Sequence, residues 1–193
     1  MTYAESITNE EINALPAGSF DGRIIVVDSK ETMKAAYDHL CRCDVIGFDT
    51  ETRPAFQKGR LNKMALVQLS SHDTAFLFRI NKMPLSKKII SLFENEKIVK
   101  VGASIRDDIK GIQKQTSFQP RGFVDIQSLV GQYGIKDISV RKVSAIVLGI
   151  RISKAQRLSN WEAQVLTPAQ QLYAATDAWT CREIFVQLTQ HGQ

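Results

Sequence analysis

The chain has 193 residues, 44% hydrophobic and 23% charged, which is typical of one folded domain and excludes a disordered or fibrous protein; its net charge of +5 favours a polyanionic partner. No apolar run approaches the roughly 20 residues that cross a bilayer, and the polar, acidic first residues exclude a signal peptide, so we expect a cytoplasmic protein that contacts no membrane. Three cysteines and three histidines are too few for a disulfide framework or a zinc site, so any metal is expected to be a hard cation held by oxygen.

The first part of the chain predicts an arm followed by a group of strands. Residues 1–20 are expected to form a loosely attached N-terminal arm, and residues 21–193 a single domain. The apolar spacing predicts a helix over 32–40 with Ser29 as its N-cap. Strands are expected at residues 23–27, 44–50, 64–70 and 74–79. Because the last three are joined by short links, we expect them to form an antiparallel meander.

After Pro84 the pattern changes to an alternation of strands and helices. The last helix is expected to begin at Thr167, as its N-cap, followed by Pro168 at the first helical position. The expected helices cover 85–93, 105–115, 126–133, 139–148 and 167–189, and the expected strands cover 97–102 and 122–126. A meander followed by this alternation predicts an α/β domain with a mixed sheet of five to six strands flanked by helices.

The first motif that carries chemistry is Asp49-Thr50-Glu51, at the end of an apolar strand. Side chains alternate between the two faces of a strand, so Asp49 and Glu51 project to the same side and Thr50 to the other. Two carboxylates this close repel each other unless a cation lies between them. The alternative is that the strand has already ended and both acids lie in a solvated turn.

A second motif lies at the strand-to-helix turn that begins with Gly102, where a tight turn or a close backbone approach is possible. Asp107 and Asp108 fall in the first turn of the next helix. Negative charge at that position is already favourable because of the helix dipole, so this motif by itself does not require a functional role.

The third motif is Tyr173-Ala-Ala-Thr-Asp177 in the last helix. Residues four apart share a helix face, so Tyr173 and Asp177 are neighbours. The small residues around them would let another element or a ligand approach closely. A surface aspartate beside a half-buried tyrosine is the alternative interpretation.

Taken in order, the three motifs resemble those of the DEDD superfamily of 3′–5′ exonucleases, in its tyrosine-bearing subgroup, over residues 23–190. The segment from Lys154 to Trp161 is similar to the one that precedes the last motif in RNase D and in the Werner-type exonuclease domain. Asp108, not Asp107, matches the family position. Asn160 stands where many relatives carry aspartate, and Asp125 matches no family ligand.

The resemblance implies a ribonuclease H-like fold and hydrolysis of nucleic acid from a free 3′ end, with two divalent ions, Mg²⁺ or Mn²⁺. Asp49 would contact both ions, Glu51 and Asp177 the ion that generates the nucleophile, and Asp108 the other ion, largely through water. Tyr173 would orient the attacking water, because a phenol with an unperturbed pKa of about 10 is a poor base at neutral pH.

A basic segment follows the first motif and is a candidate contact for nucleic acid, because basic side chains can follow phosphates and an aromatic ring can stack on a base. Its candidate residues are Arg53, Phe56, Lys58, Arg60 and Lys63. The alternative is a solvated hairpin turn.

Several functions remain open on the residues alone. A compact chain without the helical accessory domain usual in RNase D favours DNA as the substrate. The alternatives are an RNase D-like enzyme that trims RNA, a phosphatase for small nucleotides, and a non-catalytic nucleic-acid-binding module on an exonuclease scaffold.

Overall fold

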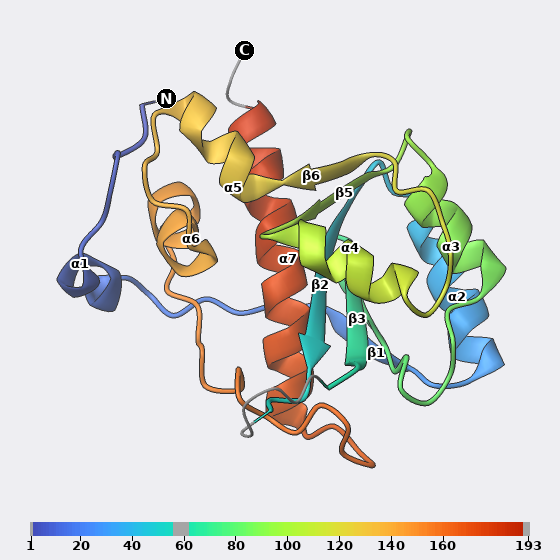
Figure 1. Cartoon of the computed structure of the whole chain (residues 1–193). Coiled ribbons are helices and arrows are strands. Elements are labelled where there is room, and N and C mark those ends of the chain that lie inside the picture. Colours follow the sequence, from blue (N-terminus) through green and yellow to red (C-terminus); the bar gives the residue numbers. More distant parts are fainter. Residues whose placement is uncertain (1, 56–61, 191–193) are drawn as a thin grey trace.

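The computed structural model describes residues 2–55 and 62–190, and its centre is a mixed sheet of six strands in the order β1-β4-β3-β2-β5-β6 (Figure 1). The strands are β1 (Arg23–Val27), β2 (Val45–Thr52), β3 (Met64–Ser70), β4 (Thr74–Phe78), β5 (Val99–Gly102) and β6 (Phe123–Asp125).

The pairing of the strands confirms the expected meander followed by parallel strands. β3 is antiparallel to both β2 and β4, as short links between successive strands require. β5 runs parallel to β2, and β6 runs parallel to β5. The expectation did not include the position of β1, which pairs in parallel with β4 at the far edge of the sheet.

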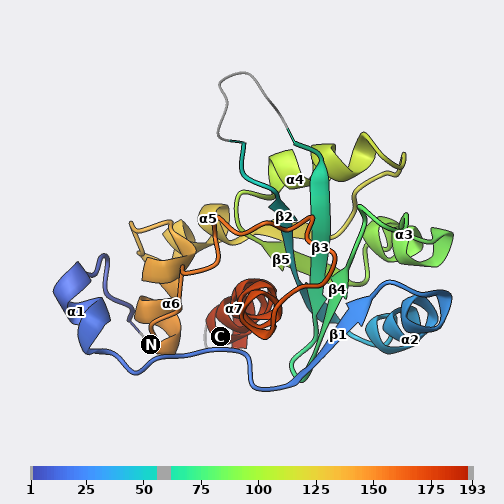
Figure 2. The same cartoon turned by 90° about the horizontal axis from the view of Figure 1, so that it is seen from below.

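Helices cover both faces of this sheet (Figure 2). They are α1 (Asn9–Ala14), α2 (Lys30–Leu40), α3 (Lys87–Glu94), α4 (Ile105–Gln113), α5 (Ile126–Leu129), α6 (Val140–Leu148) and α7 (Pro168–Gln190). α7 lies along one face, and α2 and α3 pack against the other, in the same apolar cluster as residues of α4. The expected helix over 126–133 is divided into α5 and a 3-10 turn, Val130–Tyr133. In the part of the chain that the structure describes, no helix is long and apolar enough to span a membrane.

Side chains of β2 alternate between the two layers of helices. Ile46 and Phe48 are fully buried on the side of α2, α3 and α4. Gly47 faces α7, where a Cβ atom would lie only 1.9 Å from the carbonyl oxygen of Ala178. A side chain at position 47 would therefore push α7 away from the sheet. This close approach fixes the depth at which the middle of α7 packs.

The N-terminal segment differs from the loose attachment that was expected. A capping box between Thr8 and Glu11 starts α1, and Ile12 is fully buried. The Gly18 N–H donates to the Arg151 carbonyl oxygen at 3.0 Å, and the Arg151 N–H donates to the Pro16 carbonyl oxygen at 2.9 Å. These long-range hydrogen bonds hold the segment against the chain between α6 and α7.

Candidate active site

Asp49 and Glu51 lie within β2, not in a turn after it. Asp49 pairs with Gln68 of β3 and Glu51 with Leu66, and the register shifts only after Glu51. The alternative of two solvated acids in a turn is therefore wrong. Because the residues are two apart on an extended strand, both carboxylates project towards α7.

Asp177 reaches this strand because alanine side chains of α7 lie beside it at the contact. Ala174 and Ala178, on either side of Asp177 in the helix, are fully buried, and Ala178 lies against Gly47. The helix begins as expected, since the Thr167 hydroxyl oxygen accepts from the Gln170 N–H at 3.2 Å. Because the start of α7 is fixed and the helix lies close to β2, Asp177 lies opposite Asp49.

Asp49, Glu51 and Asp177 form the carboxylate cluster. One carboxylate oxygen from each lies within 4.8 Å of those of the other two. Three anionic oxygen donors around one point are the ligands that Mg²⁺ and Mn²⁺ prefer, and nitrogen or sulfur donors are not part of the cluster. The donor set therefore fits a hard divalent cation.

The pKa values show how unfavourable this arrangement is without a cation. Burial, followed by repulsion from Asp177, Glu51 and Asp108, raises the pKa of Asp49 well above its usual range. Burial and repulsion from Asp177 raise the pKa of Glu51 to about 8. Burial raises the pKa of Asp177 to about 7, against the opposing effects of the Tyr173 hydroxyl and the charge of Lys154. A bound cation would reverse these shifts.

Asp108 approaches from the other face of the sheet. It lies in the first turn of α4, and its Oδ1 accepts a hydrogen bond from the Thr50 hydroxyl. It is not one of the three residues in the carboxylate cluster, yet its charge raises the pKa of Asp49 and Glu51. Asp108 therefore lies beside the carboxylate cluster and not within it. A hydrogen bond from Thr50 of β2 holds its side chain there.

Tyr173 stands one helical turn before Asp177, half-buried against Trp161. The two ring centroids are 6.0 Å apart, and the Trp161 side chain is fully buried. Trp161 is therefore a packing residue that holds the phenol in place. Burial, followed by the charges of Asp177 and Glu51, raises the pKa of Tyr173 far above neutrality, so its hydroxyl keeps its proton.

Asp125 has a structural role that explains why an acid stands there. Its carboxylate accepts from the N–H groups of Ser104 and Ile105, both at 3.2 Å, and from the Gln127 N–H at 3.0 Å. Ser104 has a φ of 57°, a conformation that costs energy for a residue other than glycine. Asp125 thereby holds the turn from which α4 and Asp108 start.

Of the predicted nucleic-acid contacts, the structure describes Arg53 and Lys63, and neither lines the hollow that contains Asp49 and Asp177. The Arg53 guanidinium lies 3.3 Å from Glu162, in a largely exposed ion pair. Lys63 is exposed and lines a different hollow, on the side of Asp108. Phe56, Lys58 and Arg60 lie outside the described residues.

A second set of basic residues, which sequence reasoning missed, lies beside the cluster instead. A hollow of about 290 Å³ contains Asp49, Tyr173 and Asp177 in its wall. Its basic side chains are Arg141, Lys154 and Arg157. The only signal for them was the family-like segment around Lys154, because no spacing rule connects them to the acids.

Comparison with known proteins agrees with this geometry. A family model described as 3′-5′ exonuclease matches residues 24–193. The chain belongs to this family. The exonuclease domain lies within the DEDD superfamily, and its fold is ribonuclease H-like, as the sequence analysis predicted.

Three relatives illustrate the range of the family. The exonuclease domain is 31% identical over 156 residues to the bifunctional 3′-5′ exonuclease/ATP-dependent helicase WRN of Mus musculus, covering 77% of this chain and 11% of that protein. It is 30% identical over 128 residues to ribonuclease D of Bartonella henselae, covering 65% of this chain and 32% of that protein. The crystal structure of the Aedes aegypti Nibbler EXO domain superposes with a TM-score of 0.78 at 25% identity, covering 90% of this chain and 94% of that one.

Proposed function

We propose that this chain hydrolyses phosphodiester bonds of nucleic acid from a free 3′ end, with two divalent ions, Mg²⁺ or Mn²⁺. The observation that carries the proposal is the carboxylate cluster, whose three oxygen donors lie within 4.8 Å of one another in a family-matched exonuclease domain. Water adds to phosphorus and the bond to the 3′ oxygen breaks, which releases a nucleoside 5′-monophosphate.

The carboxylates supply the ion sites. Asp49, Glu51 and Asp177 would hold divalent cations directly, and Asp108 would contribute through water, since it stands outside the cluster but close enough to affect it. Bound there, the ions lower the pKa of water and neutralise charge on the phosphate. The membership of the tyrosine-bearing subgroup rests on Tyr173, one helical turn before Asp177.

The protein residues around the ions orient the reactants. The Tyr173 hydroxyl keeps its proton, so it acts as a hydrogen-bond donor that orients the attacking water and not as the base. The Lys154 ammonium lies close enough to lower the pKa of Asp177. At this position its positive charge also favours binding of the negatively charged phosphate. Trp161 restricts the phenol ring by packing.

DNA is the preferred substrate in this proposal, as the sequence analysis expected, and a cytoplasmic location remains a prediction. One relative is named a ribonuclease and another a helicase-linked exonuclease, so RNA trimming is the alternative within the same chemistry. The two substrates differ in the 2′ hydroxyl, which a protein can read directly.

One set of substrates tests the proposal. The protein is incubated with Mn²⁺ or Mg²⁺ and 5′-labelled single-stranded DNA, recessed duplex DNA and RNA, each with a free and with a blocked 3′ end. We expect a ladder that shortens from the free 3′ end of DNA and disappears with EDTA.

Other outcomes would select the alternatives. A ladder on RNA alone would support an RNase D-like enzyme, and cleavage of mononucleotides alone would support a small-nucleotide phosphatase. Binding without any cleavage, in protein shown to take up the metal, would contradict the proposed activity and favour a non-catalytic module.

A further inference from the structure

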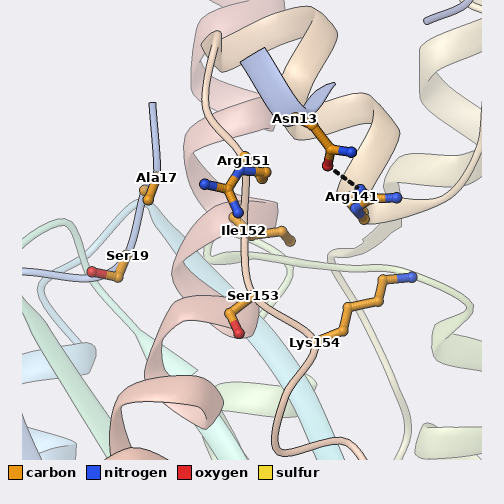
Figure 3. A pocket seen from close by; sticks show the side chains of 9 residues that line it. Asn13, Ala17, Ser19, Arg141, Arg151, Ile152, Ser153 and Lys154 are labelled. Atoms are coloured by element: carbon orange, nitrogen blue, oxygen red, sulfur yellow. Dashed lines mark hydrogen bonds between the residues drawn. The ribbon is translucent and has the colours of Figure 1, made fainter. Parts of the chain in front are cut away.

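A second hollow lies next to the carboxylate cluster, between the N-terminal segment and the chain that links α6 to α7 (Figure 3). Its volume is about 500 Å³, and it is lined by two chain segments distant in sequence. Ala17 and Ser19 stand on one side, and Arg151, Ser153 and Lys154 on the other.

The N-terminal wall of this hollow is fixed in place. Ala17 and Arg151 form an isolated parallel β-bridge, flanked by the two backbone hydrogen bonds that join Arg151 to Pro16 and Gly18. Gly18 packs so closely that an added Cβ would lie 2.7 Å from the Cβ of Ile150. The hollow is therefore a built feature of the fold, with backbone pairing along its floor.

The charge of the hollow has one sign. Arg141, Arg151 and Lys154 line it, and no carboxylate belongs to its lining. Within residues 2–55 and 62–190, no Asp or Glu oxygen lies within 4.0 Å of these three cationic groups. The Arg141 guanidinium donates to neutral side chains, the amide oxygens of Asn9 at 2.9 Å and Asn13 at 3.4 Å. Cations that form no ion pair at a concave surface attract a polyanion.

The second hollow is also continuous with the candidate active site. Arg141, Ile152 and Lys154 line both hollows, so the two share a wall. Lys154 also connects the two hollows electrostatically, because its positive charge lowers the pKa of Asp177. A strand whose 3′ end lies at the carboxylate cluster would thus find its next phosphates beside Arg141 and Arg151.

We propose that this hollow, formed by residues 13–19 and 141–154, binds the phosphodiester backbone of the substrate strand on the 5′ side of the nucleotide that is removed. The proposal rests on the proposed function for the identity of the strand. Residues 13–19 precede the family-matched residues 24–193, so the N-terminal wall is a feature of this chain and not of the family model. The N-terminal segment thereby becomes part of the substrate site and makes affinity depend on substrate length.

The test uses single substitutions in the full chain. Arg151→Glu removes the exposed cation without touching its backbone hydrogen bonds. Ser19→Lys and Ser19→Glu change the opposite wall in opposite directions, at a side chain that is exposed. Lys30→Glu is the matched control, because it makes the same change of charge at an exposed position at the start of α2, on the other side of the sheet (Figure 2).

Two substrates separate the hollow from the reaction site: a dinucleotide, and a single strand of about ten nucleotides. For the longer strand, we expect Arg151→Glu to raise KM roughly five- to tenfold and to reduce the slope of log KM against log salt by about 0.7, the effect of one lost phosphate contact. Ser19→Glu should raise that KM and Ser19→Lys should lower it. The kcat for the dinucleotide should stay within about twofold of wild type for all variants, and Lys30→Glu should change neither value.

The outcomes distinguish this proposal from the proposed function. If wild type cuts DNA or RNA but Arg151→Glu and Lys30→Glu give the same KM for the longer strand, the hollow is not a substrate site although the enzyme is an exonuclease. Equal losses on both substrates would likewise overturn it. If wild type cuts nothing, anisotropy of the labelled strand in EDTA still decides the matter: Arg151→Glu must weaken binding more than Lys30→Glu does, or the proposal is wrong.

Discussion

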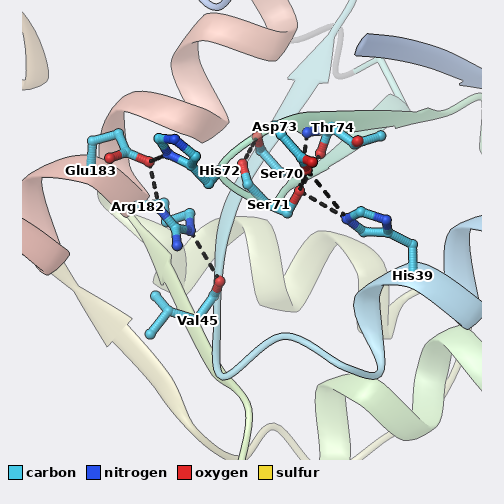
Figure 4. Close-up of polar contacts among 9 residues, drawn as sticks. All are labelled: His39, Val45, Ser70, Ser71, His72, Asp73, Thr74, Arg182 and Glu183. Atoms are coloured by element: carbon cyan, nitrogen blue, oxygen red, sulfur yellow. Dashed lines mark hydrogen bonds and ion pairs between the residues drawn. The ribbon is translucent and has the colours of Figure 1, made fainter. Parts of the chain in front are cut away.

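Polar groups at the two ends of β2 lie in opposite environments. At the end that carries Asp49 and Glu51, burial and mutual repulsion raise the pKa values of both carboxylates. At the other end, the hairpin between β3 and β4 holds polar groups that are paired (Figure 4). There the hydrogen bond from the Ser71 hydroxyl lowers the pKa of Asp73. Of these two ends, the one whose carboxylates are destabilised is the one where a cation can bind.

The paired end is a network with a structural role. The Ser71 hydroxyl donates to Asp73 at 2.8 Å and accepts from the Thr74 N–H at 3.0 Å, while His39 Nε2 lies 2.9 Å away. The Arg182 Nε donates to the Val45 carbonyl oxygen at 3.3 Å, which ties α7 to the start of β2 (Figure 4).

The residue types in this network, Ser, His and Asp, do not form a hydrolase triad. A triad needs the carboxylate and the serine at different nitrogens of the imidazole. Here the same nitrogen, His39 Nε2, faces both Ser71 and Asp73, the latter at 3.7 Å. Ser71 is also only 5% exposed, so a substrate has no access to its hydroxyl.

The largest effect is expected from a substitution in the carboxylate cluster. Asp49→Asn should lower kcat by at least roughly 10²–10³-fold, because a cation ligand at the reaction centre is lost. In EDTA the same variant should melt at a higher temperature than wild type, since one repelling charge is removed. Activity is measured on the labelled 3′-ended strand and stability by thermal melting.

The matched control for this substitution is Asp107→Asn. The Asp107 side chain is 93% exposed and pairs loosely with Lys110, so both activity and stability should stay near wild type. Wild-type activity in purified Asp49→Asn would refute the assignment of the carboxylate cluster.

A smaller loss is expected when the phenol beside the cluster loses its hydroxyl. Tyr173→Phe should reduce kcat by about 10–100-fold and leave metal binding unchanged, because the hydroxyl orients water and ligates no ion. The ring and its packing against Trp161 remain. The loss should be the same at every pH of the plateau, since Tyr173 keeps its proton throughout; a loss that grows with pH would show that the phenol acts as the base.

The pH dependence of stability sharpens the comparison of the two ends. A carboxylate whose pKa rises on folding binds its proton more tightly in the folded state, so the folded state loses stability as pH rises through that window. For Glu51 the window runs from 4.5 to about 8. In EDTA, the melting temperature should therefore fall by at least about 4 °C between these limits.

Divalent metal gives the second half of this experiment. Mg²⁺ or Mn²⁺ should raise the melting temperature more at the alkaline limit than at the acidic one, because only the ionised carboxylates bind it. Glu51→Gln should flatten the fall in EDTA. A melting temperature that rises with pH in wild type would contradict the shifts in the cluster.

A substitution in the network of paired polar groups should lower the stability of the protein, whereas Asp49→Asn should raise it in EDTA. Ser71→Ala removes a hydroxyl that serves both Asp73 and the Thr74 N–H, so we expect a loss of about 1–3 kcal/mol in the free energy of unfolding. The kcat should not change. Urea unfolding measures the first and the labelled-strand assay the second, with the exposed Ser91→Ala as control.

The smallest effect concerns Gln68, which pairs with Asp49 across the two strands. It is fully buried, and among the described residues neither atom of its amide has a hydrogen-bond partner. Gln68→Met should therefore raise the free energy of unfolding in EDTA by about 1 kcal/mol. If the variant is less stable and its kcat also falls, the amide supports the Asp49 carboxylate in solution.

Much of the fold followed from local patterns. The alternation around Phe48 placed Asp49 and Glu51 on one face, and Thr167 with Pro168 placed the start of α7, because strand period and capping act over only a few residues. The prediction of a loosely attached N-terminal arm was wrong for the opposite reason. The attachment of this segment depends on hydrogen bonds to Arg151, which is far away in the chain.

Local sequence accounts for the order of the three motifs, the strands and helices that carry them, and the shared side to which Asp49 and Glu51 project, since these depend on neighbouring residues. Tertiary packing brings α7 close to Gly47, which lets Asp177 join Asp49. It also keeps Asp108 outside the cluster and brings Arg141 and Arg151 to the N-terminal segment. Such contacts join residues distant along the chain, and packing and loop closure, not local propensity, determine them.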